Sequence, residues 1–167
     1  SLHDALPILV NSNLPDDILS ALSEHNVPAH FLNFEMPETV ESSEHTTVNI
    51  HRIRSGGSGF SLEDFGKVGS GLSKISDSGF DVIKLDKSLV QPSLDRSNKK
   101  AGIILESLIG MIRQLGIGVA AEGVETEEMA NELIADGVNY LQGYYYSRPL
   151  SEGKFLDFIK QHNMKGT

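Results

Sequence analysis

The sequence predicts an α/β domain with a parallel sheet, either open or closed into a barrel. Two observations carry this prediction: strand-like and helix-like segments alternate along the chain, and no linker or low-complexity stretch divides its 167 residues. Chains of this length most often form one domain. Hydrophobic residues make up 39% of the sequence, which is enough apolar material for a buried core.

The first part of the chain predicts two helices and two strands. Residues 13–26 carry a proline and two aspartates near their start and then an apolar stripe, which is typical of a helix. Alternating apolar and polar residues predict a strand over 30–36, and 59–64 predicts the next strand. A weaker helix is predicted over 38–53, and the glycine-rich run 66–71 is expected to be a loop.

The second part of the chain alternates regularly between strands and helices. A β-branched strand precedes a helix whose apolar residues recur every three to four positions and which stops at Gly116. A later helix has Thr126 as its predicted N-cap. The predicted elements are strand 80–86, helix 99–116, a strand within 117–125, helix 126–137, strand 138–143 and helix 151–162.

Charge and residue usage exclude several classes of protein. The formal net charge is −9, so the chain is a poor binder of DNA or RNA, whose phosphates are contacted by Lys and Arg. The absence of cysteine excludes a disulfide framework and a cysteine-ligated zinc site. No stretch approaches the roughly 20 apolar residues of a membrane-spanning helix.

Polar side chains fall at the carboxyl end of every predicted strand. They are Glu35, then Glu63 and Asp64, then Lys84 and Asp86, then Glu122, and finally Gln142. In a parallel barrel these ends converge on one face, where active sites lie. A single carboxylate at a strand end is more often an ordinary surface residue, so the prediction rests on the whole set.

This set of side chains suits metal-dependent chemistry on an anionic substrate. Carboxylate and amide oxygens are the ligands that Mg²⁺ and Mn²⁺ prefer. Two such ions roughly 3.5–4 Å apart would clamp a phosphodiester and generate hydroxide from a bridging water. A nearby lysine would orient that water and offset phosphate charge.

Four segments carry a resemblance to a known family. The segments EDFGKVGSGLSKI, FDVIKLDKSLV, GIGVAAEGVET and LQGYYYSRPL resemble the second half of the EAL domain, the cyclic di-GMP phosphodiesterase family. The resemblance covers about residues 12–162. It implies a (β/α)₈ TIM-like barrel, of which this chain would hold roughly five of eight strand–helix units. It also implies cleavage of cyclic di-GMP to linear pGpG with two Mg²⁺ or Mn²⁺ ions.

The resemblance also implies a role for individual residues. The implied metal ligands are Glu35, Glu63, Asp64 and Glu122, and the implied catalytic residues are Lys84, Glu122 and Gln142. Glu38 is expected to stabilise the glycine-rich loop. Arg148 and Glu125 are expected on the substrate side, although Glu125 is equally well explained as an acidic residue just before a helix cap. The tyrosines 144–146 are expected to stack on guanine or to pack at the rim.

Several features depart from the family pattern. The Glu-Ala-Leu segment is absent, residues 1–8 do not fit and are expected to be a non-native leader, and 9–167 is assigned as a partial EAL domain. Glu63 stands where the family has an aspartate, and Lys67-Val68-Gly69 stand where it has Thr-Gly-Tyr. We therefore expect weak or no hydrolysis by this chain. The alternative is a degenerate domain that binds cyclic di-GMP or a protein partner, and another barrel enzyme acting on phosphorylated ligands is a remote third option.

The resemblance also sets expectations about the setting of the chain. Strand edges and apolar surface left open by a partial barrel favour a marginal fold or a homodimer. Flanking sensory or diguanylate cyclase domains are expected in the full-length protein. The expected location is the bacterial cytoplasm, with tethering to the membrane through other parts of the protein left open.

Overall fold

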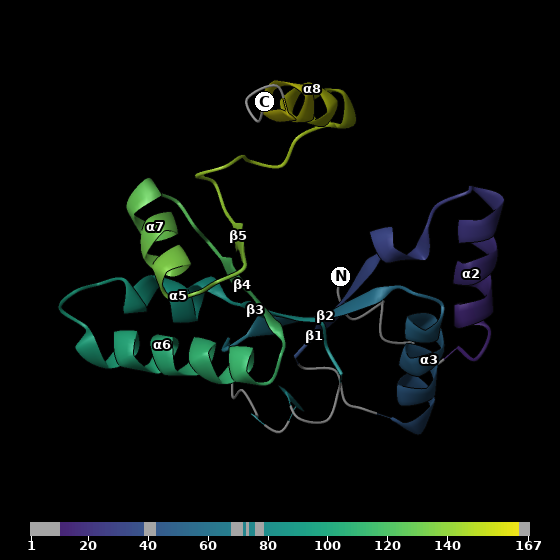
Figure 1. Cartoon of the computed structure of the whole chain (residues 1–167), viewed down its shortest axis with the longest axis horizontal. Coiled ribbons are helices and arrows are strands. Elements are labelled where there is room, and N and C mark those ends of the chain that lie inside the picture. Colours follow the sequence, from purple (N-terminus) through teal and green to yellow (C-terminus); the bar gives the residue numbers. More distant parts are fainter. Residues whose placement is uncertain (1–10, 39–42, 68–71, 73, 76–78, 164–167) are drawn as a thin grey trace.

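A five-stranded parallel sheet is the centre of the computed structural model (Figure 1), which describes residues 11–38, 43–67, 72, 74, 75 and 79–163. The strands pair in chain order, each with the next. They are β1 (Asn33–Pro37), β2 (Gly59–Phe65), β3 (Val82–Leu85), β4 (Gly118–Glu122) and β5 (Tyr140–Gln142). This order is that of consecutive strand–helix units and confirms the predicted α/β class. The expectations for residues 1–8 and for most of the loop 66–71 fall outside the described residues.

Helices lie before, between and after the strands, and all but the last described helix flank the sheet on two sides in Figure 1. The described helices are α2 (Leu14–Glu24), α3 (Glu44–Ser55), α5 (Lys87–Ser93), α6 (Lys99–Gln114), α7 (Glu127–Ala135) and α8 (Glu152–Asn163), with a 3₁₀ turn η2 (Ala29–Phe31). Helices α5, α6 and α7 lie toward one end of the sheet, and α2 and α3 toward the other (Figure 1). No helix in this described set is long and apolar enough to cross a membrane.

The hydrophobic core lies between the sheet and its helices. Strand residues Phe60, Ile83 and Val119 are almost completely buried, as are Ile53 of α3 and Ile109 of α6. Strands of a parallel sheet are covered on both faces and are therefore apolar along most of their length. The charged side chains at the carboxyl ends of β2, β3 and β4 are thus held on strands that are mostly buried.

Three local predictions need correction. The segment predicted as a strand over 30–36 begins with η2, closed by a hydrogen bond from the Phe31 amide to the Pro28 carbonyl, and β1 starts only at Asn33. The helix predicted over 38–53 begins at Glu44, because the Ser43 side chain caps it by accepting from the Thr46 amide. The short helix α5 was not expected, since it has one buried apolar residue and contains Pro92.

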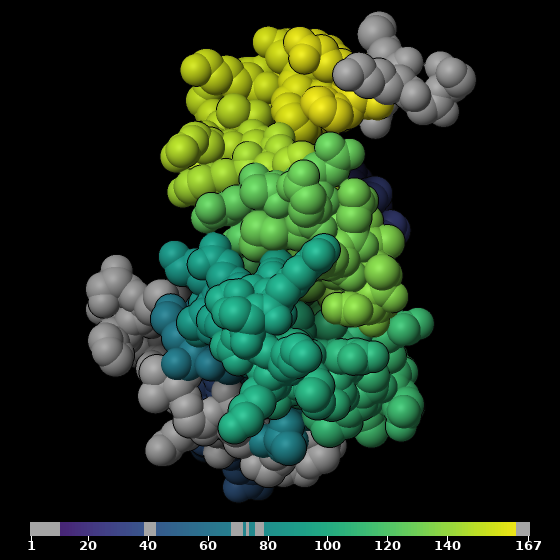
Figure 2. All heavy atoms as spheres, turned by 90° about the vertical axis from the view of Figure 1, so that its left-hand side faces the viewer, coloured from purple at the N-terminus to yellow at the C-terminus, as the bar shows by residue number. Residues whose placement is uncertain are grey.

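Helix α8 stands apart from the rest of the chain. An extended segment after β5 carries it away from the sheet (Figure 1), and it forms the yellow upper end of the molecule in Figure 2. None of its described residues is buried, and Phe155 and Leu156 remain 51% and 49% exposed. This exposed apolar face agrees with the apolar surface that the sequence leads us to expect.

Candidate catalytic site at the strand ends

A buried lysine on β3 gathers carboxylates from three other strands. The Lys84 ammonium lies 2.7 Å from Glu35 Oε1 of β1, 3.0 Å from Glu122 Oε1 of β4 and 3.5 Å from Glu63 Oε1 of β2. Its side chain is 8% exposed, whereas that of Glu35 is 44% exposed. The predicted convergence of these four residues is therefore present in the structure.

Strand geometry explains how two adjacent acidic residues both reach this rim. In a regular strand, neighbouring side chains point to opposite faces. The pairing of β2 with β3 is irregular between Leu62 and Phe65, and Asp64 has a left-handed backbone with φ of 60°. A bulge of this kind redirects a side chain. Glu63 consequently faces Lys84, whereas Asp64 faces Asp86 and Glu122.

A second acidic group lies beside the lysine and shares one residue with it. Asp64, Asp86 and Glu122 each place a carboxylate oxygen within 4.8 Å of the other two, the spacing needed to hold one metal ion. Asp86 is 6% exposed and caps α5 by accepting a hydrogen bond from the Ser88 amide at 2.8 Å. Within the described residues, Glu35 and Glu63 do not belong to this group.

Asp86 is a member of this group for which the sequence predicts no role. It lies among the polar residues at the strand ends, but the family resemblance implies no function for it. The signal that could have identified it is its place directly after β3, two positions beyond Lys84, where an aspartate both caps a helix and faces the rim. Because the sequence pattern does not predict α5, it does not identify Asp86 as the cap of that helix.

Electrostatics differ between the members of the site. Burial lowers the pKa of Lys84, but hydrogen bonds from its ammonium to Glu35 and Glu122 outweigh this and raise the pKa above its usual value. Burial, followed by the charge of Glu35, raises the pKa of Glu63 despite the opposing charge of Lys84. Burial raises the pKa of Asp86, yet the hydrogen bonds from Ser88 lower it overall. Lys84 is thus cationic at neutral pH.

Glu38 connects the end of β1 to the turn that follows β2. The carboxylate of Glu38 is buried and accepts a hydrogen bond from the Gly66 amide at 3.3 Å, and its own amide donates to the Glu63 carbonyl at 3.1 Å. The Lys74 ammonium donates to the Glu38 carbonyl. These contacts hold Glu38 against the turn at Gly66.

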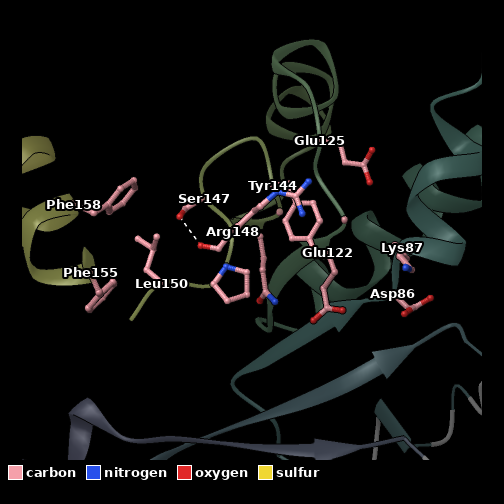
Figure 3. A pocket seen from close by; sticks show the side chains of 14 residues that line it. Asp86, Lys87, Glu122, Glu125, Tyr144, Ser147, Arg148, Leu150, Phe155 and Phe158 are labelled. Carbon is pink, nitrogen blue, oxygen red and sulfur yellow. Dashed lines mark hydrogen bonds between the residues drawn. The ribbon is translucent and has the colours of Figure 1, made fainter. Parts of the chain in front are cut away.

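An open cleft of about 610 Å³ extends from the acidic group toward α8. Figure 3 shows Asp86 at one end, Glu122, Tyr144 and Arg148 in the middle, and Phe158 at the other end. The Arg148 guanidinium lies 4.3 Å from the centre of the Tyr144 ring, a cation–π contact. The cleft thus offers acidic, aromatic and cationic groups in succession.

The remaining predicted residues also line this cleft. Gln142 is the last residue of β5 and pairs in register with Glu122. Glu125 lies just before the Thr126 cap of α7 and accepts a hydrogen bond from the Gln91 amide group at 3.4 Å. Of the three consecutive tyrosines, only Tyr144 lines the cleft.

The residues present fit divalent cations of the hard type. The cluster of Asp64, Asp86 and Glu122 offers only carboxylate oxygens, which suit Mg²⁺ and Mn²⁺ and do not select soft metals. The carboxylates of Glu35 and Glu63 face the Lys84 ammonium in this structure. The donor set is therefore compatible with Mg²⁺ or Mn²⁺.

The chain matches known phosphodiesterases in sequence. Residues 7–149 match the EAL domain family. The chain is 32% identical over 147 residues to the cyclic di-GMP phosphodiesterase RocR of Pseudomonas aeruginosa, covering 87% of this chain and 37% of RocR. It is 31% identical over 163 residues to the probable cyclic di-GMP phosphodiesterase PdeB of Escherichia coli, covering 97% of this chain and 30% of PdeB. The chain thus spans about a third of the length of these relatives.

Solved structures with the same fold lead to the same family. The EAL enzyme Bd1971 with bound cAMP and cyclic di-GMP superposes with a TM-score of 0.85 at 28% identity, over 92% of this chain and 40% of Bd1971. BlrP1 of Klebsiella pneumoniae, in a complex with manganese and cyclic di-GMP, gives a TM-score of 0.73 at 28% identity, over 82% of this chain and 35% of BlrP1. The five parallel strands and their helices are accordingly a portion of the TIM-barrel-like EAL fold, and the chain belongs to the EAL domain family.

Proposed function

We propose that the domain containing this chain hydrolyses cyclic di-GMP to linear pGpG with two divalent cations, Mg²⁺ or Mn²⁺. One observation carries the proposal: Glu122 contacts the Lys84 ammonium and also belongs to the group of three carboxylates. It lines the open cleft as well. The choice of cyclic di-GMP as substrate is supported by the similarity to the phosphodiesterase RocR and the probable phosphodiesterase PdeB. The similarity to Bd1971, whose structure contains cyclic di-GMP, supports it as well.

The proposed metal ligands are those expected from the sequence, with one addition. They are Glu35, Glu63, Asp64, Glu122 and, from the geometry of the acidic group, Asp86. When bound, the cations would polarise the phosphodiester and lower the pKa of a water molecule.

The chain's own residues position the reactants. Lys84 is held in place by Glu35 and Glu122, so its ammonium can orient the attacking water and offset phosphate charge. Gln142, paired with Glu122 across β4 and β5, is proposed to hydrogen-bond to that water. Hydrolysis forms a bond from the water oxygen to phosphorus and breaks the bond from phosphorus to a ribose oxygen, which leaves with a proton.

The substrate is proposed to lie along the cleft toward Arg148. The guanidinium of Arg148 is suited to a phosphate, and the exposed face of Tyr144 is suited to a guanine ring. Glu125 lies beside this path and can accept hydrogen bonds from the guanine edge. Glu38 supports the site indirectly by holding the turn at Gly66.

A second candidate function is a cyclic di-GMP-binding or protein-interaction module without turnover. Two observations favour it: Glu63 stands in place of the family aspartate, and the Lys67 ammonium contacts both oxygens of Asp64. A longer ligand arm displaces a metal ion, and a misplacement of about 1 Å can cost on the order of a hundredfold in rate.

The proposed setting follows from family membership. We propose that the chain works in the bacterial cytoplasm within a longer signalling protein that carries sensory or diguanylate cyclase domains. A homodimer is proposed as well, since exposed apolar side chains remain on α6 and α8, among them Ile103, Ile104 and Phe155.

Product formation tests the proposed reaction. We expect the domain-length protein containing this chain to convert cyclic di-GMP to pGpG in the presence of Mn²⁺, measured by separation of the two nucleotides. Glu122→Gln should lower the rate at least a hundredfold, whereas the exposed control substitution Lys99→Met should leave it unchanged. Binding of cyclic di-GMP without any pGpG would reject the enzyme and support the binding module.

A further inference from the structure

We propose that Lys67 is a built-in competitor of the divalent cation at the Asp64, Asp86 and Glu122 group, so that it lowers the affinity of this site for metal. This inference rests on the metal-binding part of the proposed function. It concerns Lys67, which stands where the family pattern has a threonine.

The first step is the position of the ammonium. Lys67 Nζ lies 3.2 Å from Asp64 Oδ1 and 3.3 Å from Asp64 Oδ2, so it contacts both oxygens that Asp64 could offer to a metal. The pKa of Lys67 is raised by its hydrogen bond to Asp64 and that residue's charge, and further by the charges of Asp86 and Glu122. All three members of the acidic group therefore act on the same ammonium.

The second step is the backbone that places it there. The Lys67 amide donates to the Asp64 carbonyl at 3.2 Å, which closes a tight turn. Asp64 has φ of 60° and Gly66 has φ of 96°, so the chain reverses within three residues. Glu38 accepts from the Gly66 amide and anchors this turn to the end of β1. The ammonium is thus delivered to the acidic group by the fold.

The third step is the conflict with a metal ion. A divalent cation at this group must take an oxygen of Asp64, which places it a few ångströms from the ammonium. Like charges at that separation repel, and the repulsion is enough to change a binding constant by on the order of tenfold near a protein surface. Lys67 is 57% exposed, so it can swing into solvent when metal binds, and added salt screens the repulsion.

Lys84 does not compete in the same way. Its ammonium contacts Glu35, Glu63 and Glu122, and no ion pair between Lys84 and Asp64 or Asp86 is present among the described residues. It is also buried and cannot leave the rim easily. Lys67 is therefore the lysine whose removal should free Asp64 for a metal.

The test measures Mn²⁺ binding to the full 167-residue chain, from the free Mn²⁺ signal in electron paramagnetic resonance. We expect Lys67→Met, which removes the charge and keeps the length, to lower the Kd for Mn²⁺ by about tenfold at low salt and less at 0.5 M salt. Lys67→Arg should bind like the unsubstituted chain, because it keeps the charge. Lys99→Met, an equal change in net charge at an exposed site on α6, should shift the Kd less than twofold.

The Asp64→Asn variant tests whether Mn²⁺ binds at Asp64. It also distinguishes a failure of the Lys67 inference from a failure of the proposed metal site. If Asp64→Asn weakens Mn²⁺ binding but Lys67→Met and Lys99→Met have equal effects, the inference is overturned and the metal site stands. If no variant binds Mn²⁺, or if Asp64→Asn binds it unchanged, the metal part of the proposed function is overturned together with the inference.

Discussion

Two lysines face the same acidic rim and differ mainly in burial. The side chain of Lys84 is 8% exposed and contacts carboxylates from β1, β2 and β4. The side chain of Lys67 is 57% exposed and contacts one aspartate three residues earlier in the chain. The comparison indicates that Lys84 is part of the architecture of the site, whereas Lys67 is an exposed charge at its edge that we propose to weaken metal binding.

The two lysines differ in the environment of the carboxylates that would lose a partner if the lysine were removed. Removing Lys84 leaves the partly buried Glu63 and Glu122 close together with no cation between them. Breaking a buried pair by deleting one partner is strongly destabilising, because an uncompensated charge remains. Removing Lys67 leaves Asp64 in contact with water, and exposed ion pairs contribute little to stability.

The largest expected effect is the loss of stability in Lys84→Met. We expect the free energy of unfolding at pH 7 to fall by about 3 kcal/mol, measured by urea denaturation. The raised pKa of Lys84 means that its contribution is fully present below the unfolded-state pKa of about 10.4, so pH 7 lies well inside that window. Lys67→Met serves as the matched variant and should leave the urea midpoint unchanged. Equal losses in the two variants would contradict the distinction drawn from burial.

Glu122 offers the next test, because it is the residue that both charge groups share. We expect Glu122→Gln to lower the free energy of unfolding by about 1.5 kcal/mol, since the Lys84 ammonium loses one charged partner at 3.0 Å. The same substitution should weaken Mn²⁺ binding at least tenfold, measured by electron paramagnetic resonance of free Mn²⁺. A change in stability with unaltered Mn²⁺ binding would show that Glu122 belongs to the lysine network alone.

A smaller effect is expected at the turn that carries Lys67. Glu38→Gln keeps a side chain of equal size but removes the charge from the acceptor of the Gly66 amide. We expect a loss of about 1 kcal/mol, together with faster hydrogen exchange at Gly66. Glu44→Gln at the exposed start of α3 is the control and should leave exchange at Gly66 unaltered. Unchanged protection in Glu38→Gln would mean that this carboxylate does not hold the turn.

The sequence predicts most of the sheet and most of the rim for simple reasons. Strand ends in a parallel sheet meet at one edge, so the convergence of Glu35, Lys84 and Glu122 follows from their positions alone. The contacts that place Asp86 and Lys67 beside Asp64 could not be predicted in this way. Asp86 depends on the short helix α5, and Lys67 depends on the left-handed conformation of Asp64. Such backbone features arise from tertiary packing more than from local pattern.

The smallest expected effect concerns Asp136, whose pKa two neighbouring carboxylates help to raise. Burial raises the pKa of Asp136, at the end of α7, and the charges of Glu106 and Glu132 raise it further. A raised pKa in the folded state gives stability that is present below the unfolded-state pKa and lost as the pH rises through the folded-state pKa. At pH 7 the ionised carboxylate is therefore unfavourable, and it also lies at the negative end of a helix.

Asp136→Asn should accordingly stabilise the chain at pH 7 by about 0.3 kcal/mol, a value kept small because solvent screens this partly exposed group. The gain should shrink as the pH is lowered from 7 toward 4, when it is followed by the urea midpoint. Asp95→Asn is the matched control of opposite sign, because hydrogen bonds from Ser97 lower the pKa of Asp95 and favour its ionised form. It should destabilise the chain at pH 7. If both variants shifted the urea midpoint in the same direction, the neighbouring charges and hydrogen bonds of a carboxylate would not determine its contribution to stability. The contrast between Lys84 and Lys67 would then lose its electrostatic basis.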